Sequence, residues 1–192
     1  MNSKNRVVSS EAEELILVDA NDTGVGYLTK AACHDGEGVL HRAFSLFLFN
    51  EAGDLLLQQR SEDKRLWPGY WSNSCCSHPR RGETMPVATR RRLLDELNIE
   101  AVLEFVYRFS YQARFGDQGS ENELCHVYLG KTSHPVQPNE QEISAIRHVS
   151  ANTLGRELDA MPEQFTPWFK MEWQALQNEH SDTLAKYCKL GK

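Results

Sequence analysis

The sequence predicts a mixed α/β or α+β sandwich formed by one domain. Three observations favour this fold class: strand-like apolar runs recur along the chain, one helical segment interrupts them, and two further helical segments follow them. A length of 192 residues is close to the usual size of one domain. We therefore expect a single folding unit over 1–192, with the polar ends 1–13 and about 180–192 frayed.

The predicted strands begin at 15–18 and 26–30, on either side of a turn-like NDTG segment. The clearest pattern is 39–49, VLHRAFSLFLF, which is apolar on both faces at its end and predicts a strand that becomes buried on both sides. The loop 50–54 connects it to 55–60, LLLQQR, and predicts a β-hairpin. Further strands are expected at about 102–113, 123–129 and 143–149.

The interrupting helix is predicted at about 86–97, where proline suits the first turn. Its apolar residues are Val87, Leu93, Leu94 and Leu97. The other face carries Arg91, Arg92 and Glu96. Two helices are expected near the end, at 154–161 and at 167 to about 177, the second with Trp168, Met171 and Ala175 on one stripe.

Composition places the chain among ordinary globular proteins, with 40% apolar and 25% charged residues and a net charge of −6. These values disfavour disorder, collagen and nonspecific coating of nucleic acid, so we expect no nucleic-acid partner. Because the net charge repels anions, any anionic ligand requires a local basic cluster or a metal ion.

The five cysteines are odd in number and include an adjacent pair that cannot readily bridge to itself. A reducing compartment is the simplest interpretation. The first residues lack the apolar core of a signal peptide, and no apolar run approaches the ~18 residues of a membrane span. We expect a soluble cytoplasmic protein without a membrane partner, and no sequence pattern sets its oligomeric state.

Three histidines and two glutamates form a candidate metal site: His34, His41, His78, Glu121 and Glu123. The two glutamates open a predicted strand, whose period of two places both carboxylates on one face. Three imidazoles and two carboxylates suit Mn²⁺, Fe²⁺ or Zn²⁺, and Mg²⁺ less well. Spacing alone does not force these side chains together, so separately packed histidines remain an alternative. Likewise, Cys75 and Cys76 suit small core residues as well as a nucleophile.

The segment 77–99, SHPRRGETMPVATRRRLLDELNI, resembles a Nudix box, the loop-helix-loop that binds a metal-diphosphate. The matching residues are Glu83, Arg91, Leu93, Asp95, Glu96 and Ile99. Three positions depart from the pattern, because Ser77 and Asn98 replace glycines and Arg92 replaces an acid that Nudix hydrolases use to bind metal. Asp95 is also shorter than the usual Glu. The resemblance therefore implies the scaffold more than hydrolysis, and a charged amphipathic surface helix is the alternative.

The whole segment from about 15 to 173 is similar to the type I isopentenyl diphosphate isomerases, a branch of the Nudix fold. The similarity is carried by LTKAACH at 28–34, LHRAFSLFLFN at 40–50, LLLQQRSEDKRLWPGYWSNSCCSHP at 55–79, DEL at 95–97, SENELC at 120–125 and FTPWF at 165–169. It implies a Nudix-like mixed sheet between helices. It also implies an isomerase of isoprenoid biosynthesis that interconverts isopentenyl and dimethylallyl diphosphate by a metal-dependent 1,3-proton shift through a tertiary carbocation.

By this resemblance, Cys76 and Glu123 flank the hydrocarbon end of the substrate as acid and base. Tyr111 relays or holds a proton, and Trp168 stabilises the cation through its π face. A sheet-packing role for Tyr111 and a core-anchor role for Trp168 are the alternatives. The same resemblance implies Mn²⁺, Mg²⁺ or Zn²⁺ at the three-histidine, two-glutamate site.

At the diphosphate end, Lys30, Arg60 and Lys64 match the basic residues of the family, and Glu96 matches the ligand of a second ion, usually Mg²⁺. Arg92 either adds charge there or only pairs with Glu96 one turn away. Two other functions remain open: a Nudix pyrophosphohydrolase acting on a nucleotide, and a diphosphate-binding module without catalysis.

Overall fold

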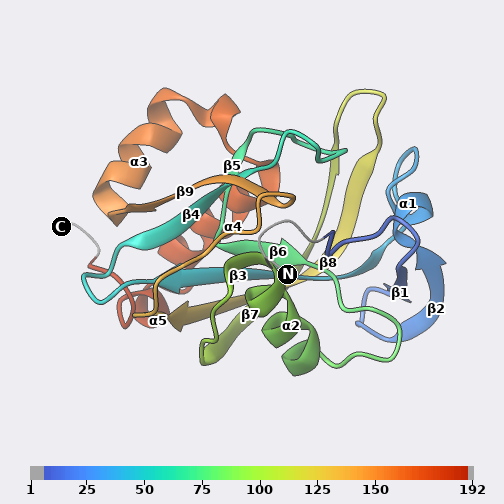
Figure 1. Ribbon diagram of the computed structural model, residues 1–192, viewed down its shortest axis with the longest axis horizontal. Helices are drawn as coiled ribbons and strands as arrows, with labels where there is room; N and C mark the ends of the chain where they lie inside the picture. Colours follow the sequence, from blue (N-terminus) through green and yellow to red (C-terminus); the bar gives the residue numbers. More distant parts are fainter. Residues whose placement is uncertain (1–6, 190–192) are drawn as a thin grey trace.

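The computed structural model describes residues 7–189, and within them nine strands form one mixed sheet with helices on both faces (Figure 1). The strands are β1 (Glu14–Val18), β2 (Gly24–Thr29), β3 (His41–Phe49), β4 (Leu55–Arg60), β5 (Trp71–Ser72), β6 (Cys75–Ser77), β7 (Leu103–Arg114), β8 (Ser120–Lys131) and β9 (Ile143–Val149). The helices are α1 (Lys30–Cys33), α2 (Met85–Leu97), α3 (Ala151–Ala160), α4 (Pro167–Asn178) and α5 (Ser181–Leu184), with a short 3₁₀ turn η2 (Pro162–Gln164). The predicted fold class is confirmed.

Strand β3 is the centre of the sheet. It runs parallel to β8, from the pair His41 and Glu123 to the pair Phe49 and Lys131, and antiparallel to β6. Every residue from 43 to 49 is buried, as its apolar run on both faces predicts. The parallel register places the first residue of β3 beside the acidic start of β8, which creates the candidate site.

The predicted hairpin between β3 and β4 is present only at its turn, where Phe49 pairs with Leu55. Beyond that pair the two strands separate, and β4 pairs with β9 and β5 instead. Ser74 explains the separation. Its hydroxyl accepts from the Leu48 amide at 2.8 Å and donates to the Leu56 carbonyl at 2.6 Å, so the chain leading into β6 is inserted between the two strands.

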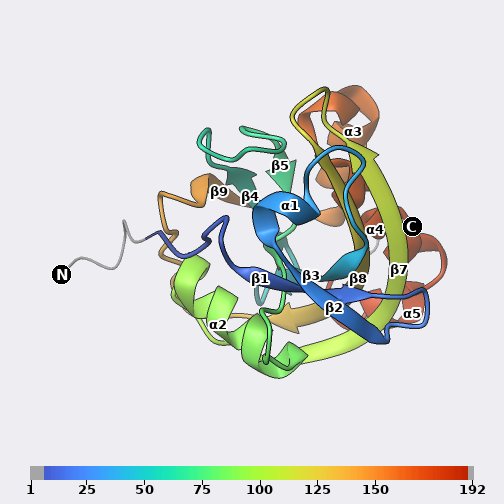
Figure 2. The same cartoon turned by 90° about the vertical axis from the view of Figure 1, so that its right-hand side faces the viewer.

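The two faces of the sheet carry separate cores because alternate side chains of β3 point in opposite directions. Phe47 belongs to the core covered by α3, α4 and α5, together with Phe169 and Trp173 of α4. Leu46 belongs to the core covered by α2, together with Leu93. Figure 2 shows α2 on one side of the sheet and the C-terminal helices on the other.

The apolar face predicted for α2 is only partly correct, since Leu93 and Leu97 are fully buried but the rest of the prediction fails. Val87 and Leu94, expected to be buried, are 55% and 39% exposed, whereas Arg92 and Glu96 are each only 2% exposed. Apolar periodicity could not show that the face carrying Arg92 and Glu96 is buried. These two charges can be buried because they neutralise each other: Arg92 Nε donates to Glu96 Oε1 at 2.7 Å. The alternative of a solvated charged surface helix therefore also fails.

The stripe predicted on α4 is only partly correct. Trp168 is buried, but Met171 is 38% exposed, and the buried face instead includes Trp173 and Leu176. The bulky aromatic side chains of this helix decide which face meets the sheet, since burying them removes the largest apolar area from water.

Residues described near the two ends of the chain pack against the domain. Val8 is 5% exposed and its carbonyl accepts from Arg80 at 2.9 Å, and Leu184 and Cys188 are buried. Residues 1–6 and 190–192 of the segments expected to fray lie outside the described residues. Among helices within 7–189, none combines the length and the apolar character needed to cross a membrane.

Candidate active site

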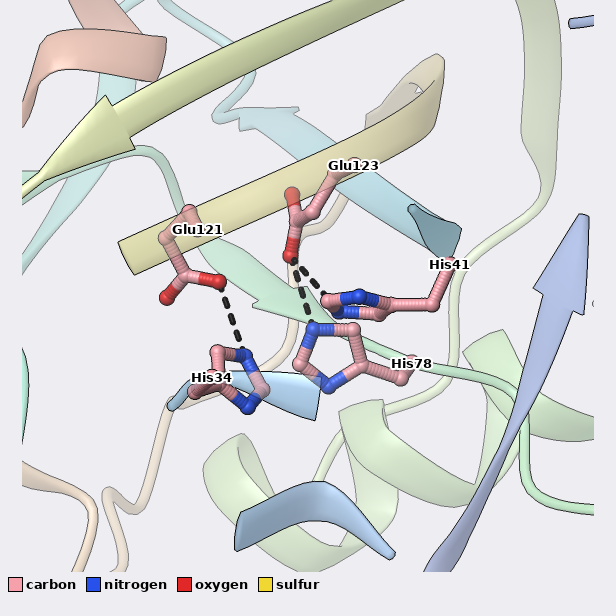
Figure 3. A group of neighbouring side chains, drawn as sticks. All are labelled: His34, His41, His78, Glu121 and Glu123. Atoms are coloured by element: carbon pink, nitrogen blue, oxygen red, sulfur yellow. Dashed lines mark hydrogen bonds and ion pairs between the residues drawn. The ribbon is translucent and has the colours of Figure 1, made fainter. Parts of the chain in front are cut away.

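Five side chains converge at one end of β3 and β8 (Figure 3). One potential ligand atom from each of them lies within 4.8 Å of all the others; they are His34, His41, His78, Glu121 and Glu123, called the metal cluster below. The predicted convergence is therefore present. All five are buried or nearly so.

Local structure explains how segments far apart in sequence meet here. Glu121 and Glu123 alternate along β8 and face the same side, as the strand period requires. His41 lies directly opposite Glu123 in the parallel register. His34 ends the short helix α1, and His78 follows β6.

The imidazoles of His34 and His41 are oriented by the backbone. The Nδ1 atom of His34 lies 2.6 Å from the Lys30 carbonyl, and that of His41 lies 2.7 Å from the Val39 carbonyl. A carbonyl only accepts, so Nδ1 carries the proton and Nε2 presents its lone pair to the cluster. Nε2 of His41 is buried without a hydrogen-bond partner among the described residues. An unpartnered nitrogen facing two carboxylates fits a divalent cation.

Electrostatics also favour a cation in the metal cluster. Burial lowers the pKa of His41 to about 4 and also lowers the pKa of His78 well below its usual value, so both imidazoles are neutral near pH 7. Burial would raise the pKa of Glu121, but the neighbouring His34 lowers it to about 2. Burial and the charge of Glu121 together raise the pKa of Glu123. No positive charge on His41 or His78 therefore opposes a cation in the metal cluster.

A cavity of about 220 Å³ opens beside the metal cluster. Its wall includes Cys76, Tyr111, Trp168 and Glu123. The Tyr111 hydroxyl donates to Glu123 Oε2 at 2.6 Å, because the two residues are opposite each other on β7 and β8. Burial raises the pKa of the Cys76 thiol to about 12, so this side chain holds a proton at neutral pH.

The two adjacent cysteines face opposite ways along β6, as an extended segment requires. Cys76 lines the cavity and accepts a long contact of 3.9 Å from Arg60 Nη1. Cys75 is fully buried beneath α2, where its thiol lies 3.4 Å from Glu96 Oε1. Only Cys76 is available to a ligand in the cavity.

Five cations line the same cavity. Four of them are called the basic clamp below: Lys30, Arg60, Lys64 and Arg92; the fifth, Arg65, pairs with Asp35. Lys30 contacts Ser9 Oγ at 2.9 Å and Glu11 at 3.0 Å. The Arg60 guanidinium donates to the carbonyls of Leu66 and Trp67, and it lies 5.2 Å from the Trp168 ring centroid. These positions fit a diphosphate anchored beside the metal cluster.

The position of Arg92 is compatible with both roles considered from the sequence, pairing with Glu96 and adding positive charge to the cavity. It pairs with Glu96, and its guanidinium also reaches the cavity wall, where it lies 3.2 Å from Glu142. Glu96 itself does not line the cavity among the described residues; it lies behind Arg92 against Cys75.

Comparison with known proteins agrees with this geometry. Residues 39–169 match the model of the NUDIX domain. Isopentenyl-diphosphate Delta-isomerase 1 of Photorhabdus laumondii is 42% identical over 90% of this chain and 99% of its own, and isopentenyl-diphosphate Delta-isomerase of Burkholderia multivorans is 43% identical over 82% and 89%. This chain belongs to the isopentenyl-diphosphate Delta-isomerase family.

Solved structures place this family member among Nudix folds. A protein of Deinococcus radiodurans, DR0079, superposes with a TM-score of 0.64 at 26% identity, covering 78% of this chain and 90% of its own. A MutT protein of Methanosarcina mazei gives a TM-score of 0.61 at 19% identity, covering 73% and 95%. The second similarity concerns the fold alone.

Sequence reasoning missed several residues of the cavity wall in this family member. They include Ser9, Glu11, Leu66 and Glu142. The first two belong to a polar segment expected to fray, and Glu142 precedes a strand without any periodic signal. Only the charged character of these segments hinted at a role.

Proposed function

We propose that the protein interconverts isopentenyl diphosphate and dimethylallyl diphosphate in isoprenoid biosynthesis, with Cys76 and Glu123 exchanging protons with the hydrocarbon end. The observation that carries the proposal is one cavity with a thiol and a carboxyl beside the metal cluster and the basic clamp on its wall. Relatives more than 40% identical that bear the isomerase name support it.

The reaction needs a proton added to the terminal methylene carbon and another removed from the carbon next to the diphosphate-bearing one. The first step leaves a tertiary carbocation, which requires a strong acid, a base and exclusion of water. Cys76 holds a proton, and Glu123 shares one with the Tyr111 hydroxyl. One of the two groups donates and the other accepts, so no net proton is gained or lost.

The surroundings of these groups suit a cation intermediate. The Trp168 ring lies on the cavity wall and presents π electrons, which attract positive charge. Trp67 packs edge-on against Trp168 with ring centroids 5.2 Å apart and is itself buried. This apolar backing limits access of water to the cation.

The metal cluster contributes through its charge. A divalent ion bound there supplies positive charge that lowers the proton affinity of Glu123. We assign Mn²⁺, Mg²⁺ or Zn²⁺ to these five ligands, because imidazole and carboxylate together suit such ions. The resemblance to the isomerase family makes Glu96 our candidate to hold the Mg²⁺ that accompanies the diphosphate, and in this structure the same carboxylate is paired with Arg92. The odd number of free thiols supports a reducing compartment such as the cytoplasm.

Incubation with isopentenyl diphosphate and Mg²⁺ in D₂O tests the proposal. We expect deuterium at the allylic positions and formation of dimethylallyl diphosphate, without release of phosphate. Release of phosphate or pyrophosphate without the dimethylallyl product would instead indicate a Nudix hydrolase. Hydrolysis is disfavoured because Arg92 replaces a metal-binding acid, and because Glu83 is held by Arg91 at 2.7 Å.

A further inference from the structure

The carboxylate of Glu142 lies inside the basic clamp, where an anion is unexpected. Glu142 directly precedes β9, is 4% exposed and lines the same cavity as Lys64 and Arg92. Its Oε2 atom contacts Lys64 Nζ and lies 3.2 Å from Arg92 Nη2. A negative charge at this position repels a diphosphate, so its presence between two of the four cations requires a physical reason.

Backbone contacts fix Glu142 to the loop that carries Lys64. The Ser61 amide donates to the Glu142 carbonyl at 3.0 Å, and the Lys64 amide donates to the Ser61 carbonyl at 3.1 Å. The Glu142 amide donates to the Asn139 carbonyl at 3.0 Å. Main chain and side chain therefore hold the carboxylate and the ammonium in one geometry, although they are 78 positions apart in sequence.

The charge balance around Lys64 shows what Glu142 does. Burial lowers the pKa of Lys64, and the neighbouring charges of Arg60 and Arg92 act in the same direction. Glu142 opposes this effect, with a smaller contribution from Glu96. Glu96, however, is already engaged by Arg92 and by the Cys75 thiol.

Glu142 is itself stabilised as an anion by the same neighbours. Burial would raise its pKa, but Lys64, Arg92 and, more weakly, Lys30 lower it. The carboxylate therefore remains charged at neutral pH and is the acid in contact with Lys64 among the described residues.

We propose that Glu142 is a positioning residue of the basic clamp: its buried carboxylate holds the Lys64 ammonium and the Arg92 guanidinium side by side, charged and aimed into the cavity for the substrate diphosphate. The inference rests on the proposed function, because it requires a diphosphate ligand. It assigns a role to a carboxylate within the basic clamp, whose other members are all cations.

Two effects of removing the Glu142 charge oppose each other, and pH separates them. Loss of a negative charge favours an anion as long as Lys64 stays protonated. Without Glu142, however, Lys64 loses its proton at a lower pH and its ammonium is no longer oriented, so the clamp loses a cation. The proposal therefore predicts weaker diphosphate binding at alkaline pH. The alkaline limb, meaning the part of the pH profile where affinity falls as pH rises, should shift to lower pH.

Inorganic pyrophosphate binding by calorimetry, from pH 6 to 10, tests this with the full-length protein, Glu142→Gln and Asp63→Asn. Asp63→Asn is the matched control because it also removes one negative charge beside Lys64. The Asp63 carboxylate is exposed, lines the same cavity and has no ion pair among residues 7–189. We expect Glu142→Gln to bind pyrophosphate roughly tenfold more weakly at pH 9, with its alkaline limb moved down by about one unit. Asp63→Asn should keep the wild-type limb.

Steady-state kinetics with isopentenyl diphosphate provide a second measurement. At pH 9, Glu142→Gln should raise KM and leave kcat at saturation nearly unchanged, because Cys76 and Glu123 are not altered. Glu142→Asp, which keeps the charge but retracts it by one methylene, should move the limb in the same direction by less, and it tests the inference if the Gln variant does not fold.

An alkaline limb that is the same in wild type and both Glu142 variants would overturn the inference, as would a fall in kcat at constant KM. A limb shift of equal size in Asp63→Asn would also overturn it, because general electrostatics would then suffice. A wild-type protein that binds pyrophosphate with a Glu142-dependent limb but does not isomerise would refute the proposed function and leave this inference standing.

Discussion

The metal cluster and the basic clamp share one cavity but are built in opposite ways. In the metal cluster, no Lys or Arg of the described chain pairs with Glu121 or Glu123, and the Nε2 atom of His41 has no hydrogen-bond partner. In the basic clamp, Lys30, Lys64 and Arg92 all contact carboxylates, and Arg60 contacts carbonyls.

The difference shows how the protein stores charge for two kinds of ligand. The metal cluster gathers carboxyls and imidazoles that have no Lys or Arg partner among the described residues, held in place by sheet register and by hydrogen bonds from His34 and His41 to backbone carbonyls, and such a group suits a metal ion. The basic clamp balances its own charge, because buried unpaired cations would lose their protons or destabilise the fold. A diphosphate bound by the basic clamp would therefore join an existing ion-pair network, whereas a metal ion would meet ligands that have no Lys or Arg partner among the described residues.

Replacing Cys76 should have the largest effect on activity. We expect Cys76→Ala to reduce isomerisation at least about 1,000-fold while leaving pyrophosphate binding largely intact, because the proposed role of the thiol is proton exchange at the reacting end and its only contact with the basic clamp is a long one to Arg60. Cys75→Ala is the matched control on the same strand and should retain most activity. Equal losses in the two variants, measured by product formation, would contradict the assignment.

Removal of one ligand should break the metal cluster but not the clamp. His41→Ala is expected to lower bound metal and activity by more than about 100-fold, since each ligand orients the others. His126→Ala, on β8 outside the cluster, should keep its metal. Metal content in the native protein should also fall as pH drops toward 4, where protons compete for His41, whose pKa is about 4. Unchanged metal content in His41→Ala protein would exclude this site.

A smaller effect, on stability, is expected from Glu172. Like the carboxyls of the metal cluster, it is buried and has no Lys or Arg partner among the described residues. Burial raises its pKa to about 8, against which hydrogen bonds with Ser45 and Cys125 act only partly. The folded state therefore binds a proton that the unfolded state releases. The resulting stability is full below about pH 4.5 and is lost as pH rises to about 8.

Glu172→Gln should remove this pH dependence and stabilise the protein at pH 9 by about 1 to 3 kcal/mol. Denaturant unfolding at pH 5 and pH 9 measures the effect. Glu179→Gln, at the exposed end of the same helix, should change stability equally little at both pH values. A Glu172→Gln variant with the wild-type pH dependence would show that this carboxyl is charged in the folded state.

Sequence predicted those parts of the site that follow from local pattern. The burial of the apolar run of β3 and the shared face of Glu121 and Glu123 both follow from local strand pattern. The convergence of the histidines came from resemblance, since spacing alone did not force it.

Other features depend on contacts between distant segments and could not be read locally. Arg92 is buried because Glu96, Glu142 and the Val8 carbonyl surround it, and two of these lie 50 and 84 positions away in sequence. The apolar pattern of α2 therefore could not show that the face carrying Arg92 is buried. Ser74 separated β3 from β4 in the same nonlocal way.

The central claim is that one cavity holds a metal ion at one end and a diphosphate at the other. A crystal structure with Mn²⁺ and a nonreactive diphosphate analogue, with anomalous scattering to locate the metal, tests it most directly. We predict an anomalous peak within ligand distance of the three imidazoles and two carboxylates of the metal cluster, and diphosphate oxygens in contact with the basic clamp. A peak elsewhere, or an analogue whose diphosphate lies against the metal cluster while its carbon end faces the clamp, would contradict the account.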